Sequence, residues 1–523
     1  MKLYSAFATV GGMTMLSRVL GFVRDILIAA VLGTGAVADA FFVAFRFPNL
    51  FRRLFAEGAF NAAFVPLFAK RLEGEGKSAA RLFAEEALAV LFVALMITTL
   101  AAEIAMPWLM VVIAPGFSGE PEKFDLAVLL TRIAFPYLLC VSLVALLSGI
   151  LNALGRFAMA AFAPVLLNIV LIGVMTGLIY AGYGNTPQAG EALAWGVAAG
   201  GVAQLAALYW WAGRQGLALR LRRPRLTPDV RRLIALGIPG VIAGGITQVN
   251  ILIGTMIATL QASAVSWLYY ADRIYQLPLG VVGIAIGVVL LPDLSRKLRA
   301  QAEADALHSQ NRSLEFSLLL TVPAAVALFV AAEPIIRVLF ERGAFTAADT
   351  PATAKALAAF ALGLPAFVLI KVFSPGFFAR EDTRTPMIYA AISVAANIAL
   401  SLALFFVIGH VGIAIATSLS GWLNAALLGS TLYRRGQFTL DAQGRRRLPP
   451  IILSSLVMGA ALWGAAYGLE PYTRAAMGTP VQAGALALLI GWGLCVYAFV
   501  AHLTGATHIG RLLRMVSGRG SRA

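Results

Sequence analysis

Charged residues are scarce in this chain. Asp, Glu, Lys and Arg make up 13% of its 523 residues, whereas hydrophobic residues make up 60%. Soluble globular chains are about half apolar and about a quarter charged, so this chain has more apolar residues than the core of a soluble protein needs. The excess predicts an all-α polytopic membrane protein whose outer helix surfaces face lipid.

Cysteine and histidine are also rare, with two and four residues. Cys140 and Cys495 both lie in apolar runs and form no CxxC motif, so they predict no disulfide framework. The histidines lack the spacing of a metal site, and the sequence has neither a P-loop nor a nucleophile motif. We therefore expect a chain that is not an enzyme, does not hydrolyse ATP and needs no cofactor.

Acidic residues are outnumbered, and the net charge is +16. In a soluble protein this balance would suggest nucleic acid as a partner. Here most Lys and Arg residues lie in short loops between apolar runs, and no basic and aromatic segment resembles a base-stacking platform. The partner that this charge predicts is the lipid bilayer, and not nucleic acid.

Long apolar runs are what the chain does have. Fourteen are long enough to cross a bilayer, and they lie at about 6–33, 37–69, 83–112, 123–153, 158–182, 190–213, 230–259, 263–295, 313–340, 353–379, 386–408, 411–433, 448–468 and 480–504. The first run reads as a span in its own right, so we expect no cleaved signal peptide.

The loops between these runs alternate in charge. The first, Gly33–Ala38, has no basic residue, whereas the second contains Lys70, Arg71, Lys77 and Arg81. The other even-numbered loops are basic too, and the ninth, an odd-numbered loop, is a mild exception. Because basic loops stay in the cytoplasm, we expect both termini there, which an even number of spans allows.

An internal repeat divides the chain. Pro136 and Asn168 have the same spacing as Pro365 and Asn397. Six spans return the chain to its starting side, so we expect two parallel six-helix lobes, as in transporters built from repeats. The predicted parts are an N-lobe at 1–218, a C-lobe at 219–438, and a last helix pair with a basic tail at 439–523.

Charged residues inside spans are expensive and indicate function. Arginines outnumber acids in the first, second and eighth runs, which contain Arg18, Arg24, Arg46, Arg52, Arg53 and Arg273 against Asp25, Asp39, Glu57 and Asp272. Two simpler readings are internal salt bridges, such as Arg24 with Asp39, and snorkelling to an interface. Neither accounts for the excess of arginine, which predicts an anionic ligand such as a phosphate or diphosphate.

Two stretches of these runs resemble a known family. Residues 13–25 read Met-Thr-Met-Leu-Ser-Arg-Val-Leu-Gly-Phe-Val-Arg-Asp, and residues 38–60 carry Asp39, Arg46, Arg52, Arg53 and Glu57. With 266–273 and 375–380, they are similar to the MurJ (MviN) lipid II flippases of the MOP exporter superfamily. The resemblance runs over essentially the whole chain.

The resemblance implies a fold and a substrate. Family members have fourteen helices, in two six-helix lobes around a central cavity and a final pair that forms a hydrophobic groove. The cavity takes the diphosphate and sugar-peptide headgroup of lipid II, the undecaprenyl-diphosphate-linked disaccharide-pentapeptide, and the groove takes the polyprenyl tail. The location implied is the bacterial inner membrane, with cell-wall synthesis machinery as a further partner.

The family's functional residues can be transferred position by position. The arginines fall on Arg18, Arg24, Arg52 and Arg273, and the further polar cavity positions on Ser17, Asp25, Asp39, Arg46, Glu57 and Ser266. At most one of Arg52 and Arg53 is expected to face the cavity. Some relatives bind sodium, for which Asn397 and Thr417 are weak candidates, because Ser401 stands where an acid is expected.

Three functions are thus compared. The flippase is favoured, and a MOP-type exporter of another lipid-linked oligosaccharide or of a drug is the alternative. A cationic-drug exporter should have an excess of acids in its cavity, and this chain has an excess of arginines. A membrane-embedded transferase should show acidic clusters for Mg²⁺ in its loops, and no cytoplasmic loop offers one.

Overall fold

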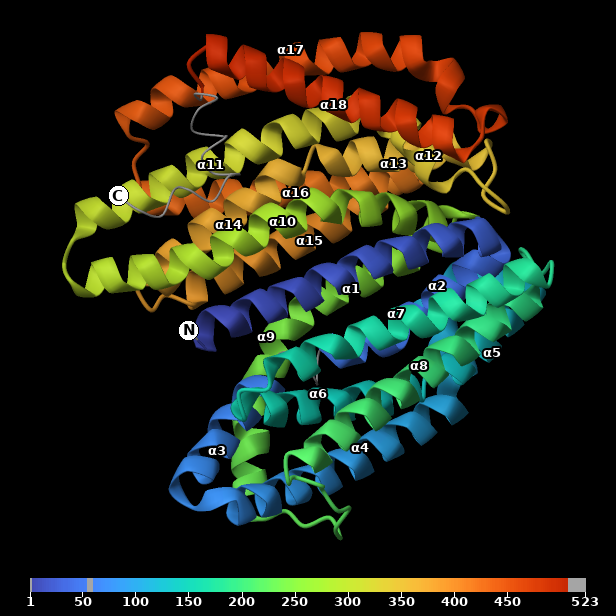
Figure 1. The fold of residues 1–523 in the computed structure, drawn as a ribbon, viewed down its shortest axis with the longest axis vertical. Helices are drawn as coiled ribbons and strands as arrows, with labels where there is room; N and C mark the ends of the chain where they lie inside the picture. Colours follow the sequence, from blue (N-terminus) through green and yellow to red (C-terminus); the bar gives the residue numbers. More distant parts are fainter. Residues whose placement is uncertain (1, 54–59, 507–523) are drawn as a thin grey trace. The chain divides into compact units, whose positions relative to one another are not determined.

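The computed structural model describes residues 2–53 and 60–506, and helices make up most of this part of the chain (Figure 1). The first half contains α1 (Lys2–Leu32), α2 (Ala36–Phe51), α3 (Asn61–Gly74), α4 (Gly76–Ile113), α5 (Pro121–Ala134), α6 (Tyr137–Ala153), α7 (Phe157–Tyr180), α8 (Pro187–Arg214) and α9 (Pro228–Ala258). The second half contains α10 (Ala264–Arg299), α11 (Glu303–Val330), α12 (Ala332–Phe340), α13 (Asp349–Ala361), α14 (Leu364–Phe378), α15 (Arg384–Ile408), α16 (His410–Arg434), α17 (Ala442–Thr473) and α18 (Thr479–Leu503).

Each of the fourteen apolar runs coincides with one of these helices or with two in succession. The second run covers α2 and α3, and the fourth, ninth and tenth runs are each divided by a break. The fourth breaks at Phe135-Pro136, where proline cannot donate the next helical hydrogen bond. Periodicity and length therefore predict where helices lie, but not these interruptions.

Ten spans among the described residues are long and apolar enough to cross a membrane. They include α5 with α6, and α13 with α14, as single spans. The other four predicted spans fall on α1, on α2 with α3, on α9 and on α10. Three of these four hold the intramembrane arginines Arg18, Arg24, Arg46 and Arg273. The chain is an all-α polytopic membrane protein.

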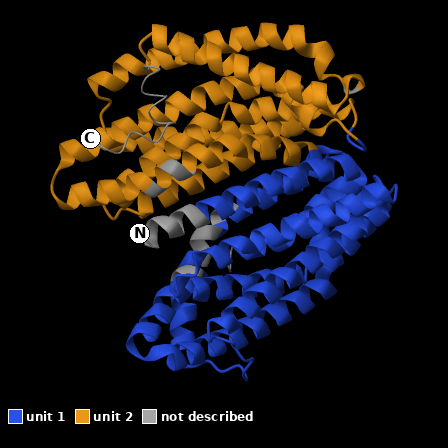
Figure 2. Cartoon of the chain, in the orientation of Figure 1, with its two compact units in different colours: residues 1–266, 343–345 blue, residues 267–342, 346–523 orange. Residues whose placement is uncertain are grey.

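The described chain forms two compact units (Figure 2). Unit 1 contains residues 1–266 and 343–345. Its core has a stack of phenylalanine rings. The ring centre of Phe64 lies 5.6 Å from that of Phe68 and 5.5 Å from that of Phe83. Gly200 of α8 brings this helix so close to α7 that an added Cβ would lie 2.5 Å from the side chain of Leu167.

Unit 2 contains residues 267–342 and 346–523. Helix α16 packs against α14 through two glycines, because Gly421 faces the ring of Phe367 and Gly429 faces the ring of Phe373. Helix α17 packs along both α11 and α18. The last helix pair is thus attached to the rest of unit 2 mainly through α11, with further contacts to α12.

The landmarks of the internal repeat occupy similar places in the two units. Pro136 precedes α6 and Pro365 lies in the first turn of α14, while Asn168 and Asn397 are buried in α7 and α15. Helix α9, which the repeat assigns to the second lobe, packs against α3 and α4 and belongs to unit 1. The division at 218 and 438 follows the repeat rather than these contacts and stays a prediction.

Candidate functional site

Arg24 is buried on α1 and is held on two sides. Its Nε and Nη2 donate to Asp25 Oδ1 at 3.0 and 2.7 Å, and its Nη1 donates to Asn168 Oδ1 of α7 at 3.0 Å. The Asn168 amide in turn donates to the carbonyl of Ser17 at 3.0 Å. Three of the predicted site residues, Ser17, Arg24 and Asp25, therefore lie in one network on the contact between α1 and α7.

Asp39 is fully buried in the first turn of α2, and it does not carry the ion pair with Arg24 that the sequence suggested. The ammonium group of Lys123, on α5, donates to its Oδ2 at 3.1 Å. Its other donors lie at the start of α10: the backbone N–H groups of Ser263 and Ser266, both at 3.0 Å, and the Ser266 hydroxyl at 2.8 Å. A carboxylate at a helix N-terminus is favourable because the unpaired N–H groups point towards it.

The other arginines of unit 1 that were predicted to belong to the site differ in exposure. Arg18 is exposed, and Arg46 is half-buried with Nη1 donating to the Thr255 hydroxyl of α9 at 2.6 Å. Arg52 is half-buried and donates from Nε to Asn49 Oδ1 at 3.0 Å, whereas Arg53 is exposed. Glu57 lies outside the described residues.

Arg273 is half-buried on α10 in unit 2. Its guanidinium carbon lies 4.5 Å from the centre of the Tyr269 ring, one turn earlier on the same helix. A cation over the face of an aromatic ring is attracted by the negative charge of that face. The convergence of Arg18, Arg24, Arg52 and Arg273 on one space stays a prediction.

Sequence reasoning missed three partners of the predicted residues: Lys123, Asn168 and Thr255. Asn168 is a polar residue in an apolar helix, which is a signal that the sequence did contain. Lys123 lies next to a loop that the charge pattern predicts to be outside, and it shows no feature that would relate it to Asp39, 84 positions away.

The sodium candidates lie on adjacent helices of unit 2. Asn397 is buried on α15 and accepts from the Ser401 hydroxyl at 3.5 Å. Thr417 on α16 donates its hydroxyl to the carbonyl of Ile413 at 2.9 Å, which is a bond within its own helix. A sodium site at these residues stays a weak prediction.

Unit 2 also contains an apolar groove of about 400 Å³ between α11, α12, α17 and α18. Large side chains line it from α17 and α18, among them Met458, Leu462 and Leu489. From α11, Ala324 and Ala327 line it at positions that share a helix face, and Ala331 lines it at the break between α11 and α12. The alanines create the space, because a larger side chain at any of these positions would fill it.

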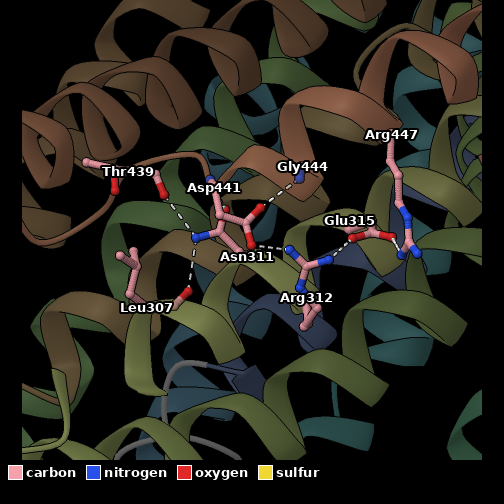
Figure 3. A network of polar contacts seen from close by, with 8 residues as sticks. All are labelled: Leu307, Asn311, Arg312, Glu315, Thr439, Asp441, Gly444 and Arg447. Atoms are coloured by element: carbon pink, nitrogen blue, oxygen red, sulfur yellow. Dashed lines mark hydrogen bonds and ion pairs between the residues drawn. The ribbon is translucent and has the colours of Figure 1, made fainter. Parts of the chain in front are cut away.

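A chain of charges joins α11 to the start of α17 close to this groove (Figure 3). Arg312 binds both Glu315 and Asp441, and Arg447 binds the other oxygen of Glu315. Asn311 donates to the Thr439 carbonyl at 2.9 Å and accepts from the Asp441 N–H at 3.1 Å, and Asp441 Oδ1 accepts from the N–H of Gly444. We call these residues, 311, 312, 315, 441 and 447, the clasp.

Comparison with known proteins relates this architecture to a family. A family model described as "Lipid II flippase MurJ" matches residues 28–475. A probable lipid II flippase MurJ of Rhizobium tropici is 51% identical over 515 residues, which are 98% of this chain and 96% of that protein. A lipid II flippase MurJ of Burkholderia cenocepacia is 37% identical, over 88% of this chain and 90% of that protein.

Solved structures agree in fold. A lipid II flippase MurJ in an inward closed conformation matches with a TM-score of 0.77 at 24% identity, over 94% of this chain and 98% of that chain. An inward-facing multidrug resistance MATE transporter of the MOP superfamily matches with a TM-score of 0.67 at 13% identity, over 82% of this chain and 98% of that chain. On the match of the family model and the identity to these relatives, the chain belongs to the lipid II flippase MurJ family.

Proposed function

We propose that this protein moves lipid II from the cytoplasmic to the outer leaflet of the bacterial inner membrane. The observation that carries the proposal is its identity of 51% to probable lipid II flippases over nearly its full length. Arginines at bilayer depth support it independently, because the headgroup of lipid II carries a diphosphate.

The diphosphate is proposed to bind Arg18, Arg24, Arg52 and Arg273, with further polar residues around them: Ser17, Asp25, Asp39, Arg46, Arg53, Glu57 and Ser266. The contacts of Asp39 strengthen the charge argument, because Lys123 neutralises this carboxylate. Asp25 is then the one acid left among the described residues 2–53, which contain five arginines. An anionic ligand suits a segment with this excess of arginine, because the guanidinium fork can bind its oxygens two at a time.

The polyprenyl tail is proposed to lie in the apolar groove of unit 2. The groove is lined almost wholly by hydrocarbon, and its volume of about 400 Å³ is within the range of ligand pockets. The drive is proposed to be the membrane potential, since the outside is positive and the headgroup is anionic. The field supplies about 2.3 kcal/mol per charge per 100 mV.

The test of the function is depletion of the protein in cells with radiolabelled lipid II. Accumulation of lipid II on the inner leaflet supports the flippase, unaltered levels support a drug exporter, and loss of lipid II indicates a synthetic enzyme. Arg24→Ala and Arg273→Ala should each abolish complementation while the protein still inserts. Arg299→Ala, at an exposed position of α10, is the matched control and should complement. Full complementation by both site variants would refute the assignment of the diphosphate site.

The groove is tested by Ala327→Phe, which fills space lined by α11. We expect at least a tenfold loss of affinity for lipid II and a much smaller loss for a soluble headgroup analogue that lacks the tail. Leu488→Phe, at an exposed position of α18 outside the groove, is the control. Equal losses for both ligands would show that the substitution acts on the headgroup site or on folding.

A further inference from the structure

The connector between α8 and α9 is held against unit 1. We call its non-helical residues, 217–227, the basic strap. Leu217 and Leu219 are buried in the hydrophobic core of unit 1. The Tyr209 hydroxyl donates to the carbonyl of Leu219 at 2.9 Å. The first part of the strap is therefore fixed by both apolar packing and a hydrogen bond.

A buried carboxylate fixes the middle of the strap. Glu85 of α4 is fully buried and accepts from the N–H of Arg220 at 3.1 Å and from Nε of Arg222. It also accepts from Nε of Arg81 at 2.8 Å. At the end of the strap, the Thr227 hydroxyl donates to Glu86 at 2.9 Å. A buried charge with three donors holds the backbone much more firmly than an exposed ion pair does.

The opposite face of the strap is exposed and combines cations with leucines. Arg220, Arg223 and Arg225 are exposed, and the side chains of these arginines form no hydrogen bond or ion pair within the described part of the chain. Leu221 is 59% exposed and Leu226 is 55% exposed. Arginine beside exposed leucine is typical of segments that lie on a membrane surface.

The end of α8 indicates where the membrane surface lies. Tyr209 and Trp210 are exposed there, as in the aromatic belts at membrane–water interfaces. Arg214 stacks on the Trp210 ring at 4.2 Å, in the last turn of the helix. The strap begins three residues later, so its arginines lie at the level of lipid headgroups, on the side that the loop charges predict to be cytoplasmic.

We propose that the basic strap is a preformed docking surface for anionic phospholipids, with Arg220, Arg223 and Arg225 on the phosphates and Leu221 and Leu226 in the acyl region. An acidic segment of a protein would satisfy the arginines, but it would leave both leucines in water. An anionic phospholipid pairs with the arginines through its phosphate and takes up the leucines among its acyl chains. Because Glu85 holds the strap, little conformational freedom remains to be lost on binding.

The test uses the full-length protein in nanodiscs of phosphatidylcholine that contain a photoactivatable phosphatidylglycerol. We expect cross-links at 215–227, and few with a photoactivatable phosphatidylcholine. An arginine near an anionic surface strengthens attraction on the order of fivefold. Arg220→Gln/Arg223→Gln/Arg225→Gln should therefore reduce cross-linking of the strap at least tenfold. This variant leaves Arg81, Arg222 and the anchor at Glu85 intact.

The matched control removes the same charge elsewhere. Arg299→Gln/Arg434→Gln/Arg446→Gln neutralises three exposed arginines of unit 2 and should leave cross-links at the strap unchanged. Equal cross-linking by the two lipids would overturn the proposal, as would strap cross-links that survive the triple substitution. Binding of a poly-glutamate peptide with no preference for phosphatidylglycerol would assign the surface to a protein instead. Melting temperatures of all variants show whether each is folded.

Discussion

Asp39 is a carboxylate with no exposed surface and with four donors on its two oxygens. Lys123 is nearly as buried, with 3% of its side chain exposed. Two opposite charges in such a place stabilise the fold only as a pair, because each alone would be buried without a counter-charge. The structure therefore makes Asp39 a residue that joins α2, α5 and the start of α10.

Asp39→Ala should lower the free energy of unfolding by about 3 kcal/mol, since it leaves the Lys123 ammonium buried and unpaired. The double variant Asp39→Asn/Lys123→Met should lose less stability than the sum of the losses in Asp39→Asn and Lys123→Met. Thermal unfolding of the purified protein measures all of them. Glu470→Gln, in an exposed pair with Arg474, is the control. Strictly additive losses would contradict a pairwise role.

Asp382 lies in the connector between α14 and α15, and its pKa is lowered to about 2. The Arg435 side chain contributes most to this shift, followed by the backbone N–H and the hydroxyl of Thr385. The folded-state pKa lies below the ordinary value of 3.8, so the carboxylate stabilises the fold fully above that pH. This contribution is lost as the pH falls towards 2.

Wild type should therefore melt at a higher temperature than Asp382→Asn at pH 6, and the difference should shrink as the pH falls from about 4 towards 2. Melting curves of both proteins across this range measure the effect. In Arg435→Gln the stability contributed by the Asp382 carboxylate should be lost at a higher pH, because the substitution removes the largest cause of the low pKa. A difference that stays constant over the whole range would refute the role of this carboxylate.

At the scale of elements, the clasp joins the last helix pair to α11. Glu315 lies one turn before Leu319, which lines the groove, and the Leu319 carbonyl accepts from the Tyr497 hydroxyl of α18 at 2.8 Å. The clasp and this hydrogen bond together tie α17 and α18 to the same stretch of α11. The width of the groove thus depends on polar contacts at one end of it.

Glu315→Gln and Arg447→Gln should each loosen the first turns of α17, and the double variant should lose less stability than their sum. We expect faster hydrogen exchange in 442–458 and unchanged exchange in 479–503, measured by mass spectrometry. Arg446→Gln changes the neighbouring exposed residue and should have no effect. Equal acceleration in both segments would indicate general destabilisation and not loss of the clasp.

Most elements could be predicted from the sequence, because an apolar run of spanning length in lipid has to be helical. The breaks at Phe135-Pro136 and at Leu362-Gly363 could not, since both lie inside continuous apolar runs. The charged residues of the candidate site could be named from the sequence, but the residues with which they pair could not. Asp39 binds Lys123 and Ser266, which lie 84 and 227 positions away in the sequence. A local sequence pattern cannot reveal contacts between residues so far apart.

At the scale of the whole molecule, the charge pattern predicts which loops lie outside. In a chain without native cysteines, made by Cys140→Ser/Cys495→Ser, Ser118→Cys should react with an impermeant maleimide added to intact spheroplasts. Ala300→Cys should react only after lysis, because its loop is basic. Both positions are exposed, so the side of the membrane on which each cysteine lies, and not its burial in the protein, decides whether it is labelled. Labelling of Ala300→Cys before lysis would invert the predicted topology.

The partners of Asp39 also set an order of events during synthesis. Ribosomes add about 5–20 residues per second, so Ser266 follows Asp39 by roughly 11–45 seconds, and Lys123 follows it by roughly 4–17 seconds. Until then α2 carries a carboxylate without its final donors, at a stage when the first helices are already leaving the ribosome. The final contacts of Asp39 on α2 can therefore form only after the start of α10 has been synthesised.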